Sequence, residues 1–312
     1  MTIISALKVN PQEAILIADE QGSMGNRKAD LYTKVARFEP NDKFKAIIGG
    51  AGSVTRFDAA IPGINEILLR AKEDPSMKGL TFAKIVSRSL VSVRRDAING
   101  YFLGQLGLTE HQIQAGYRTV DGEKIPISQE IISHYHKILN EGDYMVSTLI
   151  LTSLEGNVDL YSTTSENTEP IVSSNASMVI GSGADAAHME LTGFLESRPR
   201  EKRTLIEPVE GLVALLSAID LARRRNVGVG GTPNIYIFNK GKLINPSENS
   251  SHLAVEIVRA TKAGYLTEKF QSEALRKLLY DNYQIDSVEV EMFDQVPLGD
   301  KNEFSRFLRG YK

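Results

Sequence analysis

The stretch that decides the fold is TIISALKVNPQEAILIAD, residues 2–19. It holds two short runs rich in β-branched and apolar residues, 3–9 and 14–19, separated by the turn sequence NPQE at 10–13. Runs of this length on either side of Asn and Pro predict two antiparallel strands joined by a turn. The run AILIA, residues 14–18, is continuously apolar, which indicates a strand covered on both faces.

The same signals recur along the chain. Alternating or apolar runs with turn residues between them predict further strands at 33–38, 44–49, 144–153, 157–163, 233–238 and 241–245, a short strand before 181, and a strand at 288–292. Apolar residues at helical spacing predict helices at 54–72, 81–103, 129–140, 184–196, 208–225, 251–263 and 265–281. The excursion at 104–128 reads as an insertion with a hairpin around Asp121-Gly122.

The order of these elements predicts the architecture. Hairpins alternate with pairs of helices, and neither regular βαβ alternation nor an internal repeat occurs. Apolar strands of this kind are buried best in two antiparallel sheets that face each other, with a helix layer outside each sheet. We therefore expect an α+β chain.

Composition excludes several classes of function. The 312 residues are 42% hydrophobic and 24% charged, with a formal net charge of -3, which is typical of a soluble globular protein without a nucleic-acid partner. The run Arg223-Arg224-Arg225 closes a predicted helix, where cations suit the helix dipole. Without cysteine, neither a disulfide nor a cysteine nucleophile is expected. With no leader and no long apolar run, we expect a cytoplasmic protein that makes no membrane contact.

Five features in order resemble a known family. They are Thr2 opening a strand, Asp19 closing the next, GSMGN at 22–26, Lys34, and IIGGAGSV at 47–54. GSG at 181–183 and RNVGVGG at 225–231 follow in the same order. The chain resembles proteasome β-subunits and their bacterial relative HslV, members of the N-terminal nucleophile hydrolases, over about 2–103 and 143–260. The resemblance implies a four-layer αββα sandwich and no cofactor.

The resemblance also implies a chemistry for Thr2. A threonine hydroxyl is a poor nucleophile at neutral pH and needs a nearby base, and the α-amine of an N-terminal threonine has a pKa of about 8. This requires removal of Met1, which a methionine aminopeptidase performs before a small residue. We therefore expect a threonine peptidase whose mature chain starts at Thr2.

The other site residues carry over from the family position by position. Lys34 would lower the pKa of the Thr2 hydroxyl and amine, and Asp19 would hold Lys34 charged. The Gly49 N–H would serve as oxyanion donor and Ser182 would support the threonine. Ser23 would pair its backbone with an extended substrate, and the residues lining the specificity pocket would be Gly22, Ile47 and Ala51.

Each residue has a structural alternative. Thr2 also suits the start of a strand, Asp19 a turn, Lys34 an edge-strand charge, and the glycines near 49–52 a strand-to-helix turn. A phosphate site is not predicted at NVGVGG, residues 226–231, because this run follows a helix. His134 and His136 lie on different faces of a predicted helix, so no metal site is predicted.

Two positions depart from the family pattern. Active proteasome subunits carry Asp and Ser where this chain has Asn226 and Val229, which weakens the support of the Thr2 amine. Three functions follow: a peptidase, a connectase-like ligase that passes the same acyl-enzyme to an amine, or an inactive structural subunit. The expected partners are a peptide or unfolded protein substrate, a homo-oligomeric ring and an ATPase. We expect one proteasome-like domain at 1–264 and a C-terminal extension at 265–312.

Overall fold

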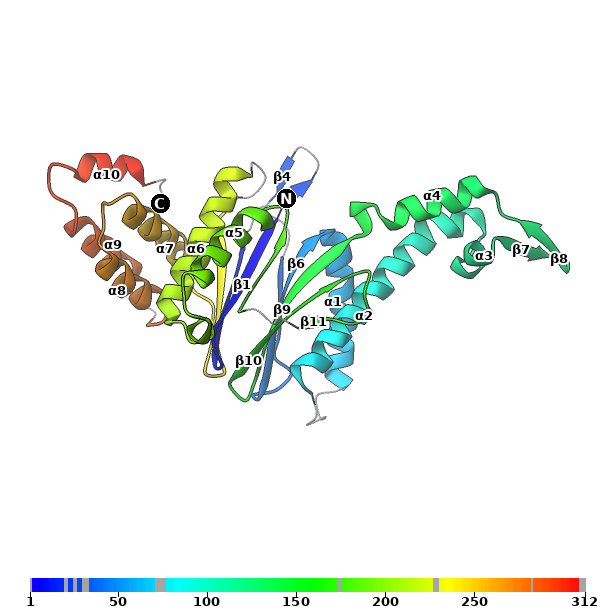
Figure 1. Ribbon diagram of the computed structural model, residues 1–312, viewed down its shortest axis with the longest axis horizontal. Coiled ribbons are helices and arrows are strands. Elements are labelled where there is room, and N and C mark those ends of the chain that lie inside the picture. The colour runs from blue at the N-terminus through cyan, green and yellow to red at the C-terminus, as the bar shows by residue number, and fades with distance from the viewer. Residues whose placement is uncertain are drawn as a thin grey trace.

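Two five-stranded antiparallel sheets face each other at the centre of the molecule (Figure 1). The computed structural model describes residues 2–19, 22–24, 27–29, 34–70, 77–172, 176–226, 230–281 and 283–308. The first sheet has the order β12 (Ser177–Gly181), β1 (Ile3–Asn10), β2 (Glu13–Asp19), β13 (Pro233–Asn239), β14 (Lys242–Ile244). The second has the order β11 (Ile171–Val172), β10 (Asn157–Thr164), β9 (Val146–Leu154), β6 (Phe44–Gly52), β5 (Val35–Phe38).

The predicted hairpin of residues 2–19 forms the centre of the first sheet. Its register pairs Ile4 with Ala18 and Leu7 with Ile15. Because side chains alternate along a strand, Ile4 faces the second sheet while Ile15 faces the helices outside. Both faces of the hairpin are therefore buried, which explains its continuous apolar character.

Helices cover the outer face of each sheet, so the predicted αββα sandwich is confirmed (Figure 1). The first sheet is covered by α5 (Ala184–Glu196), α6 (Pro208–Arg225) and α7 (Glu248–Lys262). The second sheet is covered by α1 (Val54–Arg70) and α2 (Gly79–Ile98). Their apolar faces close two separate outer cores, with a third core between the sheets.

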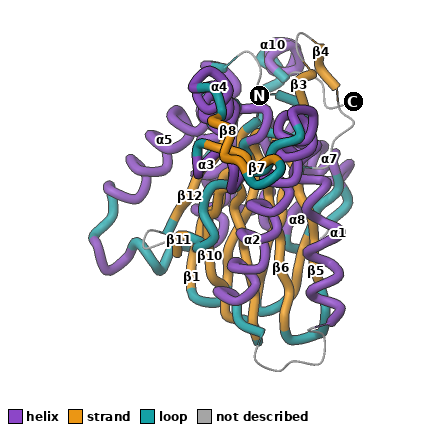
Figure 2. The backbone as a smooth tube through the Cα atoms, turned by 90° about the vertical axis from the view of Figure 1, so that its right-hand side faces the viewer, coloured by secondary structure: helices purple, strands orange, loops and turns teal. Residues whose placement is uncertain are grey.

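An arm projects from the second sheet's side of the molecule (Figure 1) and is turned toward the viewer in Figure 2. It continues from α2 through a π-helical turn (Asn99–Leu103), a 3-10 turn (Gly104–Leu106), α3 (Glu110–Ala115), β7 (Tyr117–Val120), β8 (Glu123–Pro126) and α4 (Gln129–Leu139). A small core of its own includes Leu103, Ile113 and Tyr135. The hairpin predicted around Asp121-Gly122 is present, and both turn residues have the positive φ that its tight turn requires.

The C-terminal region is helical, and the strand predicted at 288–292 is wrong. α9 (Ile285–Asp294) takes its place, with α8 (Glu268–Leu279) before it and α10 (Lys301–Phe307) after it. A strand would bury Val290 with Val288 and Met292, whereas the helix buries the latter two, four residues apart, and leaves Val290 61% exposed.

Residues on both sides of the predicted boundary at 264–265 contribute to one hydrophobic cluster, which also contains the outer face of the first sheet. Gly264 lies at the boundary with a positive φ, directly after the end of α7. A helix with the length and apolar composition of a membrane span is not found in the described part of the chain.

Candidate active site

A buried ion pair lies where β2 ends and β5 begins. The Nζ atom of Lys34 donates to Oδ1 of Asp19 at 2.8 Å. The two side chains are 3% and 1% exposed, so both charges are withdrawn from water. Removing two charges from water costs several kcal/mol each, which good geometry and further hydrogen bonds must offset.

Backbone groups supply those further hydrogen bonds to Asp19. The Ile3 N–H donates to Oδ1 at 2.8 Å, and the Gly230 N–H donates to Oδ2 at 3.4 Å. Burial raises the pKa of the Asp19 carboxyl, while the charge of Lys34 and these donors act in the opposite direction. Asp19 thus joins β1, β5 and the segment that precedes β13.

Thr2 precedes β1 and is held by the GSG segment. The Ser182 Oγ accepts from the Thr2 N–H at 3.2 Å and its hydroxyl donates to the Thr2 carbonyl at 3.4 Å. The Gly183 N–H reaches the same carbonyl at 3.5 Å. At Gly181, φ is +99° and a Cβ would lie 2.1 Å from the Thr2 oxygen, so only glycine allows this approach.

Four predicted site residues therefore meet at one end of the sandwich: Thr2, Asp19, Lys34 and Ser182. Ile3, the residue after Thr2, is bound directly by Asp19. Thr2 is 8% exposed. The Ile3–Asp19 bond joins residues 16 positions apart in sequence, and the Thr2–Ser182 bond joins residues 180 positions apart. Both become possible because β1 pairs with β2 and β12.

Gly49 lies on β6 in the second sheet, opposite Val35, the residue after Lys34. A Cβ at Gly49 would lie 2.8 Å from Ile4, so the glycine permits the close approach of the two sheets. The neighbouring Gly50 N–H donates to the Lys34 carbonyl at 2.8 Å, which anchors the start of β5.

The predicted substrate-binding residues fall in two places. Ile47 and Ala51 belong to the core between the sheets, and Ile47 has no exposed surface. Gly22 and Ser23 lie on β3 (Gly22–Met24), which pairs with β4 (Arg27–Ala29). Within the described residues, no strand pairs with the other edge of β3.

Asn226, a departure from the family pattern, has a local role at the end of α6. Its side-chain amide donates to the Ala222 carbonyl at 3.0 Å, and its backbone N–H donates to the same atom. A carboxylate could not make the first of these bonds. Val229 lies outside the described residues.

Sequence reasoning missed the contribution of Gly230. Gly230 donates its backbone N–H to Asp19. Every residue except proline carries such a donor, so the residue type does not reveal which backbone N–H will be used. The Gly-Gly pair at 230–231 after a predicted helix is the signal that marks a loop there.

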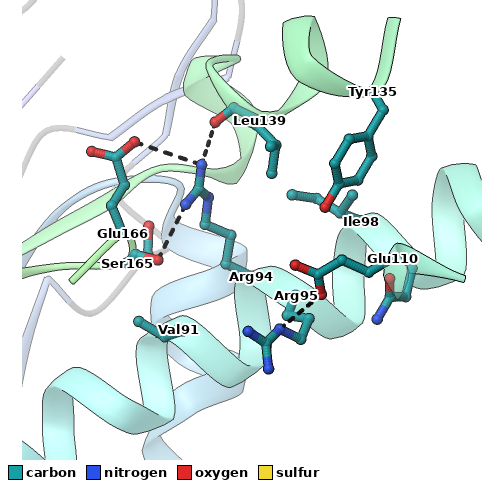
Figure 3. Close-up of a pocket in the computed structure, with 10 residues that line it drawn as sticks. Val91, Arg94, Arg95, Ile98, Glu110, Tyr135, Leu139, Ser165 and Glu166 are labelled. Carbon is teal, nitrogen blue, oxygen red and sulfur yellow. Dashed lines mark hydrogen bonds and ion pairs between the residues drawn. The ribbon is translucent and has the colours of Figure 1, made fainter. Parts of the chain in front are cut away.

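A separate pocket lies at the root of the arm, away from Thr2, with a volume of about 200 Å³ (Figure 3). Arg94 on α2 points across it toward the Leu139 carbonyl, to which it donates, and toward Glu166, 3.6 Å away. Arg95 pairs with Glu110 at 3.1 Å. The charged side chains that line the pocket are thus paired with one another, and these pairs join the arm to the sandwich.

Two facing antiparallel sheets between helix layers, with the hairpin after Thr2 at the centre of one sheet, form a proteasome-like fold that solved structures share. Anbu, an ancestral β-subunit, from Yersinia bercovieri is similar, with a TM-score of 0.56 and 14% identity over 86% of this chain and 96% of that one. A Gly-1 mutant of Anbu from Hyphomicrobium sp. strain MC1 has a TM-score of 0.55 and 14% identity over 86% of this chain and 99% of that one. No protein-family model matches the sequence, and no curated protein sequence does so either.

Proposed function

We propose that this protein is a threonine-type peptidase with Thr2 as nucleophile. The observation that carries the proposal is the buried Lys34–Asp19 pair, which is bonded through Asp19 to the residue directly after Thr2. A buried ion pair is weak evidence for stability alone, because apolar residues of the same size often stabilise as well. A fixed positive charge beside a candidate nucleophile is what an activated hydroxyl requires.

The first chemical step uses the amine and hydroxyl of one residue. After removal of Met1, the neutral α-amine of Thr2 accepts the hydroxyl proton while Oγ attacks the carbonyl carbon of the substrate. Ser182, whose Oγ lies 3.2 Å from the Thr2 nitrogen, holds the amine in place. Lys34 lowers the pKa of the hydroxyl through its charge, and the Gly49 N–H is the proposed donor to the oxyanion.

The second step breaks the peptide bond. The tetrahedral intermediate collapses, the leaving amine takes the proton from the Thr2 ammonium, and an ester remains on Oγ. Water then attacks the ester with the amine again as base, which releases the acid and regenerates Thr2. If an amine replaces water, the same ester yields a new peptide bond, which is the ligase alternative.

The substrate class proposed is an extended peptide or an unfolded segment of a protein. Among the described residues one edge of β3 is unpaired, and this supports the proposal because an extended chain can add there as a strand through backbone hydrogen bonds. Gly22 and Ser23 are two of the three residues of this strand.

The decisive experiment is an intact mass measured before and after reaction with a peptide epoxyketone. This probe reacts with a hydroxyl and a free amine of one residue. We expect a mature chain that starts at Thr2, one adduct per chain, and no adduct on Thr2→Ala. Thr119→Ala, an exposed threonine on the arm, is the matched control and should label as the native chain does.

Retention of Met1 in all of the native protein would contradict the proposal, because the nitrogen of Thr2 would then be an amide. Absence of labelling on a folded chain that starts at Thr2 would favour the inactive structural subunit. Analysis of products with a peptide and an added amine separates hydrolysis from ligation.

A further inference from the structure

Two of the three arginines that end α6, Arg223 and Arg224, have different partners. Arg223 donates to the carbonyl of Gly231, eight residues further along. Arg224 pairs with Asp220 on its own helix. All three arginines lie in the last turn of α6, as predicted, and Arg223 has a further role because its bond crosses from the helix to the segment before β13.

That segment reaches the ion pair. Gly230, adjacent to Gly231, donates its N–H to Oδ2 of Asp19 at 3.4 Å. β13 then begins at Pro233, which lies opposite Asp19 in the sheet register. Thr232 donates to Glu248 of α7 at 3.4 Å. The segment is thus bonded to α6, α7 and Asp19 within three residues.

We propose that Arg223 is a positioning residue, which fixes the Gly230–Gly231 backbone so that the Gly230 N–H is aimed at Asp19. The backbone of these two glycines is intrinsically permissive, and Gly231 has a φ of +76°. An external bond is needed to hold one conformation of such a segment. The catalytic consequence of this arrangement rests on the proposed function.

This role of Arg223 compensates for Asn226, which stands where the family pattern has an acidic residue. Asn226 is bonded to the end of α6 rather than contributing a charge, so an acidic side chain does not support the site from this position. A backbone donor to Asp19, held by Arg223, supports the anionic form of Asp19 and through it the charge on Lys34. Hydrogen bonds to a carboxylate favour its ionised form.

Asp19 and Arg223 have different charged neighbours. Within the described chain, Lys34 is the charged side chain that faces Asp19, and the Thr2 nitrogen lies on Ser182 close by. Arg223 faces His252 of α7, near Glu248, Glu256 and Arg259. Burial lowers the pKa of His252, and Arg223 adds to this, so His252 also titrates differently without Arg223.

The test measures Asp19 directly. Carboxyl-carbon NMR of protein labelled at aspartate, with Asp19 assigned by Asp19→Asn, gives its titration in the native chain and in Arg223→Met. Loss of the held donor should move the Asp19 midpoint upward by about one pH unit. Arg224→Met is the matched control and should leave the midpoint unchanged. Arg223→Lys keeps the charge and should give an intermediate shift.

An unchanged Asp19 midpoint in folded Arg223→Met, or an equal shift in Arg224→Met, would overturn the proposal. If the Met variant does not fold, the Lys variant decides, and an unchanged midpoint there overturns it. The acidic limb of the pH profile for epoxyketone labelling should move in the same direction as the midpoint. A native chain that never labels contradicts the proposed function alone, because the NMR result stands without activity.

Discussion

At the scale of single residues, the candidate site contains two charges that are almost completely buried. Asp19 and Lys34 form an ion pair in which each charge balances the other. If one partner is removed, the remaining buried charge destabilises the folded state by several kcal/mol unless that group becomes neutral. The raised pKa of Asp19 means that the acid can take up a proton when its partner is removed. Substitutions here affect both the free energy of unfolding and the chemistry, so each must be measured.

Lys34→Ala is expected to abolish epoxyketone labelling and to lower the free energy of unfolding by about 3 kcal/mol, because Asp19 stays buried without its partner. Lys34→Arg keeps the charge but is bulkier and planar, so we expect a folded protein that does not label. Urea denaturation and labelling kinetics on both variants test this. Full labelling of Lys34→Arg would count against a specific role for the lysine amine.

Glu13, at the start of β2, gives a pH dependence. Burial raises the pKa of its carboxyl, while the nearby polar side chains of Tyr280 and Asn10 act to lower it. The folded state therefore binds a proton more tightly than the unfolded state, and this contribution to stability is lost as pH rises through the raised pKa. We expect Glu13→Gln to be more stable than the native chain at pH 8, with a difference that shrinks toward pH 4.

Urea midpoints across this range measure the effect of Glu13→Gln. Glu155→Gln serves as control, since Glu155 is an exposed turn residue between β9 and β10. A difference that is constant with pH would show that charge burial at Glu13 is not the cause.

At the scale of elements, Arg94 bonds the C-terminal end of the arm to the sandwich. Arg94 of α2 donates to the carbonyl of Leu139 at the end of α4 and to the carbonyl of Ser165 at 3.4 Å, with Glu166 3.6 Å away (Figure 3). Its side chain is 13% exposed. It thus bonds the last turn of α4 to the segment that follows β10.

Arg94→Met should loosen the arm while the sheets stay intact. Hydrogen bonds from charged groups contribute about 1.5–3 kcal/mol each when buried, so amide protection in α4 should fall by at least tenfold. Hydrogen exchange measured by mass spectrometry compares α4 with β1 and β9. Arg95→Met is the control, because Arg95 is exposed and pairs with Glu110 alone among the described residues. Equal protection of α4 in both variants would contradict this role.

At the scale of the whole molecule, the chain adds two parts to the sandwich: the arm beyond the second sheet and the helices α8–α10 outside the first (Figure 1). Both lie outside the two sheets that carry the site. The residues of β7 and β8 are almost all exposed, and two-stranded hairpins are marginally stable alone. The arm is therefore a candidate surface for contact with another chain.

We expect self-association, because the exposed strands β7 and β8 of the arm offer a surface to a second copy of the chain. Light scattering at tens of micromolar should give a mass that is a multiple of 34.4 kDa. A monomer would rule out the ring expected from the sequence, and with it the ATPase that would feed such a ring, and would favour the ligase. A variant with 117–126 replaced by a short glycine linker then tests whether the arm carries the contact.

Much of the fold was predictable because it follows from local rules. Alternation and turn residues at 2–19 predict the central hairpin, and Asp121-Gly122 predicts the turn of the arm. The run VEVEM at 288–292 has the same alternation but forms a helix, because burial of Val288 and Met292 against the C-terminal helices outweighs a period of two. The local sequence pattern does not show which distant helices these two residues will contact.

The candidate site divides in the same way. Thr2, Asp19, Lys34 and Ser182 are the residues that the family resemblance predicts, from residue type and order along the chain. Their mutual distances, the almost complete burial of the ion pair and the donors from Ile3 and Gly230 arise only when β1, β2, β5 and β12 come together. The sequence determines which side chains are present. Desolvation and backbone hydrogen bonds arise only in the assembled structure, and they determine the charge states of Asp19 and Lys34, on which the candidate site depends.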